Sequence, residues 1–313
     1  MNSCDFVTIF FNDEIEIDLL RIQAKSFQFV SPKIVNNIIL VFNENYDCAD
    51  DILFKIIKEY PVELYQKIKV FSRSEILSSS EKKDGWTIQQ ILKLKICKII
   101  SSDYYVLLDA KNHFIRKADW NTFFTNDNLP KVFSGYPGTM EIYFNNSMRD
   151  MGHSEKTLSN INQNLARQVK LDRGLGNKHI TTTPVVFKTE YVLSLIKYIS
   201  ENNMIDNLKS TYTEFYLYLS FLYKEKKINS KQYYNCPCMS VFGYKKEFHN
   251  QISSKKFLLN NEHFCMIGLH RFNVKNIMDK SDLDFLKILY EKKFGNFAIV
   301  ILNKYMDDDR SRD

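Results

Sequence analysis

The sequence predicts an α/β protein with a mostly parallel central sheet flanked by helices. Short apolar runs typical of buried strands occur at residues 6–11, 38–42, 68–71 and 104–108. Segments with helical periodicity separate these runs, and strands that alternate with helices usually pair in parallel. Because the 313 residues contain no long Pro/Gly/Ser linker, we expect one domain over residues 1–305 and a disordered tail over 306–313.

The first half of the chain follows this alternation closely. After the first strand, residues 12–14 carry helix-start signals, and the apolar residues that follow recur at helical spacing. A second helix is expected over residues 50–59. A third, over residues 84–101, begins at an Asp-Gly turn and has too many apolar side chains for one narrow face. We therefore expect it to pack on two sides and to lead directly into strand 104–108.

The second half is less regular. Residues 131–144 contain a Gly-Tyr-Pro-Gly turn and are predicted to form a strand on either side of it. Residues 145–181 are polar and are expected to form a helix flanked by loops that order over a ligand. The remaining expectations are a short helix at 119–125, strands at 182–187 and up to residue 269, and helices at 190–200, 213–223 and 282–294.

Composition excludes several classes of protein. The net charge of +6 is spread along the chain, which suits a small anionic ligand or a loose membrane-surface contact rather than nucleic acid. No run reaches the ~18 apolar residues of a membrane span, and the chain does not open with a signal-peptide pattern. The six cysteines lack the two pairs that a zinc site needs, so Cys236 and Cys238 are interpreted as structural. We expect a cytoplasmic protein with reduced thiols, with at most a peripheral contact at the inner membrane face.

The candidate chemistry centres on Asp109, which directly follows the buried strand 104–108. Open α/β sheets bind ligands at the carboxyl ends of their strands. A carboxylate there could hold Mg²⁺ or Mn²⁺ against a diphosphate, but Lys111 stands where such a clamp would have its second acid. Asn112 completes the group. The alternative is an ordinary strand-end turn, in which Asp and Asn are common.

Other candidates lie further away in the sequence. His270 follows an apolar run and could bind a metal or a diphosphate, with Arg271 beside it, or it could be an ordinary surface or core histidine. Gln90 and Lys93 share a helix face and could reach a phosphate, or they could line a solvated edge. Glu214 is the acid of an aromatic helix and, if buried, would have a raised pKa suited to a base. A first-turn acid is also favoured by the helix dipole alone.

Taken together, these segments resemble GT-A-type glycosyltransferases, and in particular a bacterial group found with capsule and lipopolysaccharide biosynthesis genes. The resemblance rests on DGWTIQQILKLKICKIISSDYYVLLDAKNHFIRK, on TPVVFKTEYV followed by TEFYLY, and on a late GLHR. It implies a nucleotide-sugar-binding part over about residues 1–145 and an acceptor-side part over about 182–305. The implied reaction moves a sugar from a nucleotide sugar, UDP-sugar first, to a hydroxyl of a glycan or lipid-linked glycan in surface polysaccharide synthesis.

The resemblance also implies roles for individual residues. Glu214 and Asp109 would be catalytic, Glu214 as the base and Asp109 at the donor diphosphate. Asp109 and His270 would hold a divalent cation, Mn²⁺ or Mg²⁺, unless Lys111 supplies the positive charge itself. Substrate contacts would come from Phe10, Phe11, Asn12, Gln90, Lys93, Lys111, Asn112, Thr183 with Pro184, and Arg271.

Two other functions stay open. One is a non-catalytic α/β binding or scaffold protein, in which Lys111 marks the loss of a metal clamp. The other is a nucleotidyltransferase that uses Asp109 for a metal. That function asks for further acids and for a Gly-rich basic loop after the first strand, which FFNDEIEI does not provide. No GxxxxGK[ST] or GxGxxG motif occurs, so phosphate-loop kinases and dehydrogenases are not supported.

Overall fold

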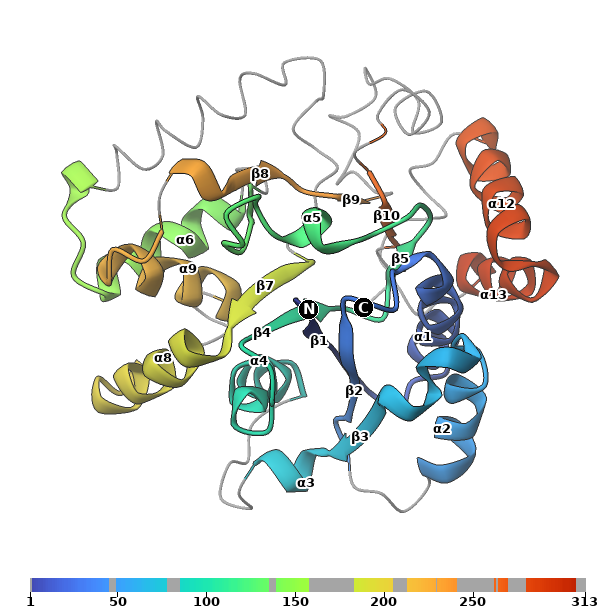
Figure 1. Ribbon diagram of the computed structural model, residues 1–313, viewed down its shortest axis with the longest axis horizontal. Coiled ribbons are helices and arrows are strands. Elements are labelled where there is room, and N and C mark those ends of the chain that lie inside the picture. The colour runs from blue at the N-terminus through green and yellow to red at the C-terminus, as the bar shows by residue number, and fades with distance from the viewer. Residues whose placement is uncertain are drawn as a thin grey trace.

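The structure is a computed structural model that describes residues 2–44, 49–77, 85–134, 139–157, 183–204, 213–228, 230–240, 262, 264–269 and 280–307. Within them, helices flank both faces of a five-stranded sheet with the strand order β3-β2-β1-β4-β7 (Figure 1). Its strands are β1 (Cys4–Phe10), β2 (Val35–Phe42), β3 (Ile68–Ser72), β4 (Tyr104–Leu108) and β7 (Val185–Lys188). The first four pair in parallel and β7 is antiparallel to β4, so the predicted mostly parallel α/β fold is confirmed.

The strand order reverses next to β1. Crossovers through α1 (Glu14–Ser26) and α2 (Ala49–Ile57) lead outward from β1 to β2 and β3. The next crossover, through α3 (Arg73–Ile76) and α4 (Gly85–Lys95), returns the chain to β4 on the other side of β1. Such a reversal leaves a crevice at the carboxyl ends of the two central strands, where open α/β sheets bind ligands. A ligand-binding site is therefore expected at the carboxyl ends of β1 and β4.

Two apolar cores lie on opposite faces of the sheet. Side chains alternate along β1, so that Phe6 and Phe10 belong to one core and Val7 and Ile9 to the other. The first core contains α1, α12 (Lys280–Phe294) and α13 (Asn296–Asp307). The second contains α4, α8 (Thr189–Glu201) and α9 (Glu214–Lys224), on the other side of the sheet in Figure 1. Helices α4 and α9 therefore cover the same face of the sheet, next to the start of β7.

Two small sheets extend the molecule beyond β4. One contains β5 (Asn112–Phe114), β10 (Met266–Gly268) and β9 (Cys238–Ser240), with β10 between the other two. The other pairs β6 (Val132–Ser134) with β8 (Tyr233–Asn235). The first of them brings residues from the last third of the chain against the turn that follows β4.

The structure corrects three expectations. The second strand predicted within residues 131–144 is wrong, because helix α6 (Thr139–Asp150) occupies that segment. Its Phe144 and Met148 lie one helical turn apart and pack against α9, which explains the helix. The helix predicted over residues 84–101 ends at Lys95 and continues as a 3₁₀ turn, Ile96–Lys98. The tail expected to be disordered over residues 306–313 is helical at its start, because residues 306 and 307 belong to helix α13.

The other elements expected within the described residues are present, including the short helix α5 (Trp120–Phe123). Residues 158–182, which include most of the segment expected to cover a ligand, and residues 308–313 of the tail lie outside the described residues. The five described cysteines are buried, and no disulfide joins them. In the described part of the chain, no helix is both long enough and apolar enough to cross a membrane.

Candidate active site

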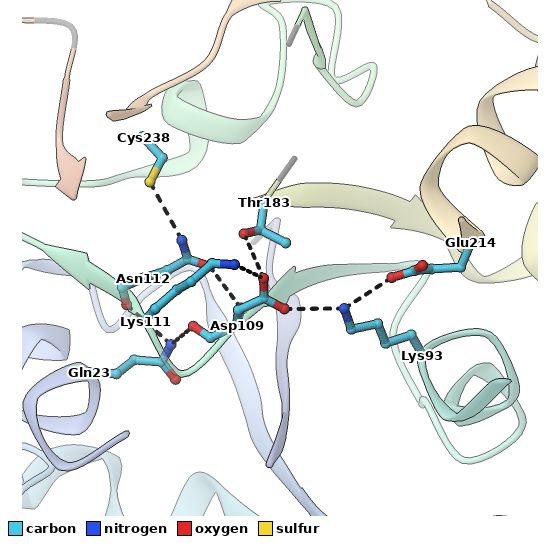
Figure 2. Close-up of polar contacts among 8 residues, drawn as sticks. All are labelled: Gln23, Lys93, Asp109, Lys111, Asn112, Thr183, Glu214 and Cys238. Atoms are coloured by element: carbon cyan, nitrogen blue, oxygen red, sulfur yellow. Dashed lines mark hydrogen bonds and ion pairs between the residues drawn. The ribbon is translucent and has the colours of Figure 1, made fainter. Parts of the chain in front are cut away.

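A tightly fixed turn follows β4. The backbone N–H of Asp109 donates to Asn112 Oδ1 at 2.7 Å, and the backbone N–H of Asn112 donates back to the Asp109 carbonyl at 2.9 Å. From α1, Gln23 Nε2 donates to the carbonyl oxygens of Asp109 at 2.6 Å and Asn112 at 3.1 Å (Figure 2). Gln23 Oε1 in turn accepts from the Thr8 hydroxyl on β1 at 2.8 Å. The backbone that carries Asp109 is thus held from β1, α1 and β5 together.

The Asp109 carboxylate has a cationic partner on each oxygen. Lys93 Nζ lies 3.2 Å from Oδ1, and Lys111 Nζ lies 3.0 Å from Oδ2. The Thr183 hydroxyl, just before β7, also donates to Oδ2 at 3.3 Å. Burial opposes ionisation, but the ammonium groups of Lys111 and Lys93 hold the pKa of Asp109 well below its usual range. Asp109 is therefore a carboxylate at physiological pH.

Lys93 links this carboxylate to a second one. Its Nζ lies 3.0 Å from Glu214 Oε1, so the ammonium of α4 bridges the turn after β4 and the first residue of α9 (Figure 2). The ammonium also lies 4.9 Å from the centre of the Phe215 ring. Burial opposes the charge of Lys93, yet Asp109 and Glu214 together raise its pKa. Burial raises the pKa of Glu214, and Lys93 offsets part of that rise.

Gln90 supports the Glu214 end of this bridge. In one orientation of its amide, Gln90 Oε1 accepts from the backbone N–H of Glu214 at 3.3 Å. In the other orientation, its nitrogen donates to the Glu214 carboxylate. Gln90 is buried one turn before Lys93 on α4, so one helix face supplies both contacts.

The members of the cluster differ sharply in exposure. Lys111 and Asp109 are 25% and 19% exposed, whereas Lys93 is 4% and Glu214 0% exposed. Thr183 and Asn112 are also buried. A molecule that reaches this edge of the sheet would meet Lys111 and Asp109, while the buried residues hold those two in place.

The described residues do not fit a divalent cation. Both oxygens of Asp109 face ammonium groups about 3 Å away, which would repel a metal ion bound there. No three His, Cys, Asp or Glu side chains come together as a metal site in the described part of the chain. His270 and Arg271 lie outside the described residues. The described chain before them ends at Leu269, whose backbone N–H donates to the Lys111 carbonyl at 3.0 Å.

The predicted residues at the end of β1 occupy different environments. Phe10 is fully buried in the core, so its ring does not border a ligand in this conformation. Phe11 is partly buried and lies beside the start of α4. Asn12 is exposed, and its backbone N–H donates to Glu44 Oε1 at 3.4 Å, joining the ends of β1 and β2. Phe11 and Asn12 thus remain candidates for ligand contact, whereas Phe10 packs in the core beneath the end of β1.

Sequence reasoning missed Gln23 as the residue that fixes the turn after β4. A signal was present, because Gln23 lies between Leu19 and Phe27 at four-residue spacing on the apolar stripe of α1. Thr8 gives a matching signal as the polar residue in the strand FVTIFF. A polar side chain in a buried stripe must find a partner, and these two find each other.

His113, one residue after Asn112, was also missed. Its Nδ1 accepts from the Tyr290 hydroxyl of α12 at 2.7 Å, and its Nε2–H points at the Leu19 carbonyl, 3.0 Å away. Burial lowers the pKa of His113 to about 3, so the ring is neutral near pH 7. The ring ties the region after β4 to the C-terminal helices. It lies within the first apolar core and takes no part in the cluster around Asp109.

Solved structures that resemble this chain include glycosyltransferases. The apo WbbM bifunctional glycosyltransferase has a TM-score of 0.50 and 13% identity, over 98% of this chain and 52% of that one. This chain therefore spans about half of WbbM, and at this identity the likeness shows the fold alone. An active-site mutant of LgtC has a TM-score of 0.49 and 10% identity, over 92% of this chain and 95% of that one. Galactosyltransferase LgtC in complex with donor and acceptor sugar analogues has a TM-score of 0.48 and 8% identity, over 93% of this chain and 100% of that one.

No curated protein matches the sequence. Residues 12–254, well over half of the chain, match a family described only as a "Family of unknown function (DUF6492)". The chain therefore belongs to the DUF6492 family.

Proposed function

We propose that this chain is a glycosyltransferase that moves a sugar from a nucleotide-sugar donor, with a UDP-sugar as the first candidate, to a hydroxyl of an acceptor. The observation that carries the proposal is the ion cluster around Asp109 at the carboxyl ends of β1 and β4. Pre-arranged charge at the switch point of an α/β sheet is typical of a site for a charged ligand. The fold shared with the glycosyltransferase WbbM supports a nucleotide sugar as that charged ligand.

The reaction sets a clear demand on the site. An acceptor oxygen forms a bond to the anomeric carbon, and the bond from that carbon to the diphosphate oxygen breaks. The electron pair of that bond leaves with the nucleoside diphosphate, and the acceptor proton passes to a base. Negative charge therefore grows on the diphosphate, and a fixed cation at that point lowers the barrier. Lys111, anchored by Asp109 and partly exposed, is the described cation best placed for this role.

The geometry supports a positioning role for Glu214 better than the role of base expected from the sequence. Its carboxylate is 0% exposed and is paired with Lys93 at 3.0 Å, so an acceptor hydroxyl has no access to it in this conformation. Gln90 holds Glu214, Glu214 holds Lys93, and Lys93 and Thr183 hold Asp109. We extend the proposal to a glycan or lipid-linked glycan of a bacterial surface as acceptor, bound on the side of residues 182–305.

A second candidate is a nucleotide-binding protein without catalysis. The observation that favours it is the pairing of Asp109 and Glu214 with ammonium groups, which leaves neither carboxylate of the cluster free to take a proton. The nucleotidyltransferase alternative gains no similar support, since it requires further acids beside Asp109.

The test is a thermal-shift panel with UDP, GDP and CMP, each in EDTA and in Mn²⁺, followed by hydrolysis of the matching nucleotide sugars. A nucleotide at 100 times its Kd should stabilise the protein by about 2.7 kcal/mol, a shift of roughly 5 °C. Asp109→Asn releases the anchor of Lys111 and should reduce both the shift and the hydrolysis. Asp127→Asn, at an exposed turn, is the matched control and should keep both. Binding without hydrolysis in the wild type would favour the second candidate, and no shift with any nucleotide would contradict both.

A further inference from the structure

Both carboxylate oxygens of Asp109 already have donors within reach. Its two carboxylate oxygens meet Lys93 Nζ at 3.2 Å, Lys111 Nζ at 3.0 Å and the Thr183 hydroxyl at 3.3 Å. A metal ion bound to either oxygen at about 2.1 Å would lie within ~5 Å of an ammonium group. It would have to displace that ammonium or tolerate its repulsion.

Displacing Lys93 is the costlier choice. Its ammonium is 4% exposed and also neutralises Glu214, which is 0% exposed, so its departure would leave a buried carboxylate without its cation. Lys111 is 25% exposed and makes its described ion pair with Asp109 alone, at 3.0 Å. Lys111 is therefore the cation of this cluster that can turn toward a ligand while Lys93 keeps Asp109 neutralised.

The chemistry of Lys111 matches a diphosphate. An ammonium carries three N–H donors, and Asp109 Oδ2 accepts one of them. The others can reach phosphate oxygens, with which lysine forms strong charge-assisted hydrogen bonds. The turn that carries Lys111 is fixed by Gln23 and Asn112, so its ammonium is placed before a ligand arrives.

We propose that Lys111 takes the place of a divalent cation at the donor diphosphate, so that this protein binds nucleoside diphosphates without a metal ion. The inference rests on the proposed glycosyltransferase function and names the group that neutralises its leaving diphosphate. Asp109 is then the anchor of Lys111, not a metal ligand.

The experiment is calorimetry with UDP and GDP, each beside its monophosphate, in EDTA and in Mn²⁺. The wild type should bind a diphosphate with the same Kd in both conditions. Lys111→Met should weaken diphosphate binding about 10-fold to 100-fold, the effect of one charge-assisted hydrogen bond, and change monophosphate binding much less. Lys111→Arg keeps the charge and should retain most of the affinity. Lys197→Met, on α8 and 78% exposed, is the control and should match the wild type.

A gain-of-function variant sharpens the test. Lys111→Asp places an acid two residues after Asp109, which should make diphosphate binding depend on Mn²⁺. Wild-type binding that occurs only in Mn²⁺ would overturn the inference and leave sugar transfer standing, as would equal losses of mono- and diphosphate affinity in Lys111→Met. If neither diphosphate binds in either condition, the proposed function itself fails and the inference falls with it.

Discussion

Replacing Lys93 by methionine should destabilise the protein mainly through Glu214. Methionine has nearly the length of lysine and can still pack on Phe215, but it has no charge. Asp109 keeps Lys111 at 3.0 Å and Thr183 at 3.3 Å, so it stays paired. Glu214 is 0% exposed and loses the ammonium that lies 3.0 Å from its carboxylate. The variant therefore tests a buried acid whose cation has been removed.

The expected cost follows from the burial of that acid. Breaking a buried ion pair by removing one partner typically costs about 3–5 kcal/mol, because the remaining charge is uncompensated. For a chain of this size, we expect Tm to fall by roughly 2 °C for each kcal/mol, or about 6–10 °C in total. Adding Glu214→Gln removes the uncompensated charge and should restore about half or more of the loss.

The cost should also depend on pH. Without Lys93, burial raises the pKa of Glu214 further above its ordinary value of 4.5. Below that value, the acid is protonated in both the folded and unfolded states, so the penalty is absent. As pH rises above 4.5, the unfolded state loses its proton first, and stability falls until the folded acid ionises as well. The defect of Lys93→Met should therefore be smaller at pH 5 than at pH 7.5.

Urea unfolding of the wild type, both single variants and the double variant gives the coupling energy directly. Lys197→Met, whose pair with Glu201 spans 3.9 Å at the surface of α8, should change stability by less than about 0.5 kcal/mol. Additive effects of Lys93→Met and Glu214→Gln, with a coupling below about 0.5 kcal/mol, would refute the reasoning. A defect equal at pH 5 and pH 7.5 would do the same.

Two further predictions concern the residues that hold the turn after β4. Gln23→Leu leaves the carbonyl oxygens of Asp109 and Asn112 without their side-chain donor, so urea unfolding should show a loss of about 2–4 kcal/mol. An unchanged midpoint would mean that the contacts of Gln23 do not hold the turn. His113, whose pKa burial lowers to about 3, should cost stability as pH falls below its unfolded value near 6.5, by about 1.4 kcal/mol per pH unit. His113→Gln removes this titration, so its stability should fall less steeply between pH 6.5 and 5, and a slope equal to that of the wild type would contradict the assignment.

The fold was readable from the sequence where one physical signal dominated. The strand at Tyr104–Leu108 is bounded by polar residues and buried on both faces, and its predicted limits agree with β4. Helix α1 was marked by Asp13, whose carboxylate caps the N–H groups of Ile15 and Glu16 at 3.1 and 3.0 Å. Around Phe144, the signals conflicted. A Gly-Tyr-Pro-Gly turn suggested two strands, but Phe144 and Met148 pack against α9, which lies about 70 residues further along the chain.

Part of the candidate site could also be predicted from the sequence, because its charged residues stand out. Asp109, Lys93 and Glu214 could each be singled out, since each is a charged residue in an apolar setting. That Lys93 joins the other two could not be read, because contacts between α4, β4 and α9 depend on the packing of two separate crossovers. Gln23 was overlooked because uncharged polar residues in helices are common and usually exposed.

The charges of the cluster explain why Lys111 and a metal ion are alternative solutions to one problem. As the chain stands, the carboxylates of Asp109 and Glu214 are balanced by the ammonium groups of Lys93 and Lys111, so the buried group is neutral before any ligand binds. An acid in place of Lys111 would leave three carboxylates against one ammonium, an excess of two negative charges, which is what one divalent cation neutralises. Adding that cation to the present cluster would instead create an excess of two positive charges in a poorly solvated place. In the proposed site, a nucleoside diphosphate would meet a cation that the protein already carries, and it would not need to bring a metal ion with it.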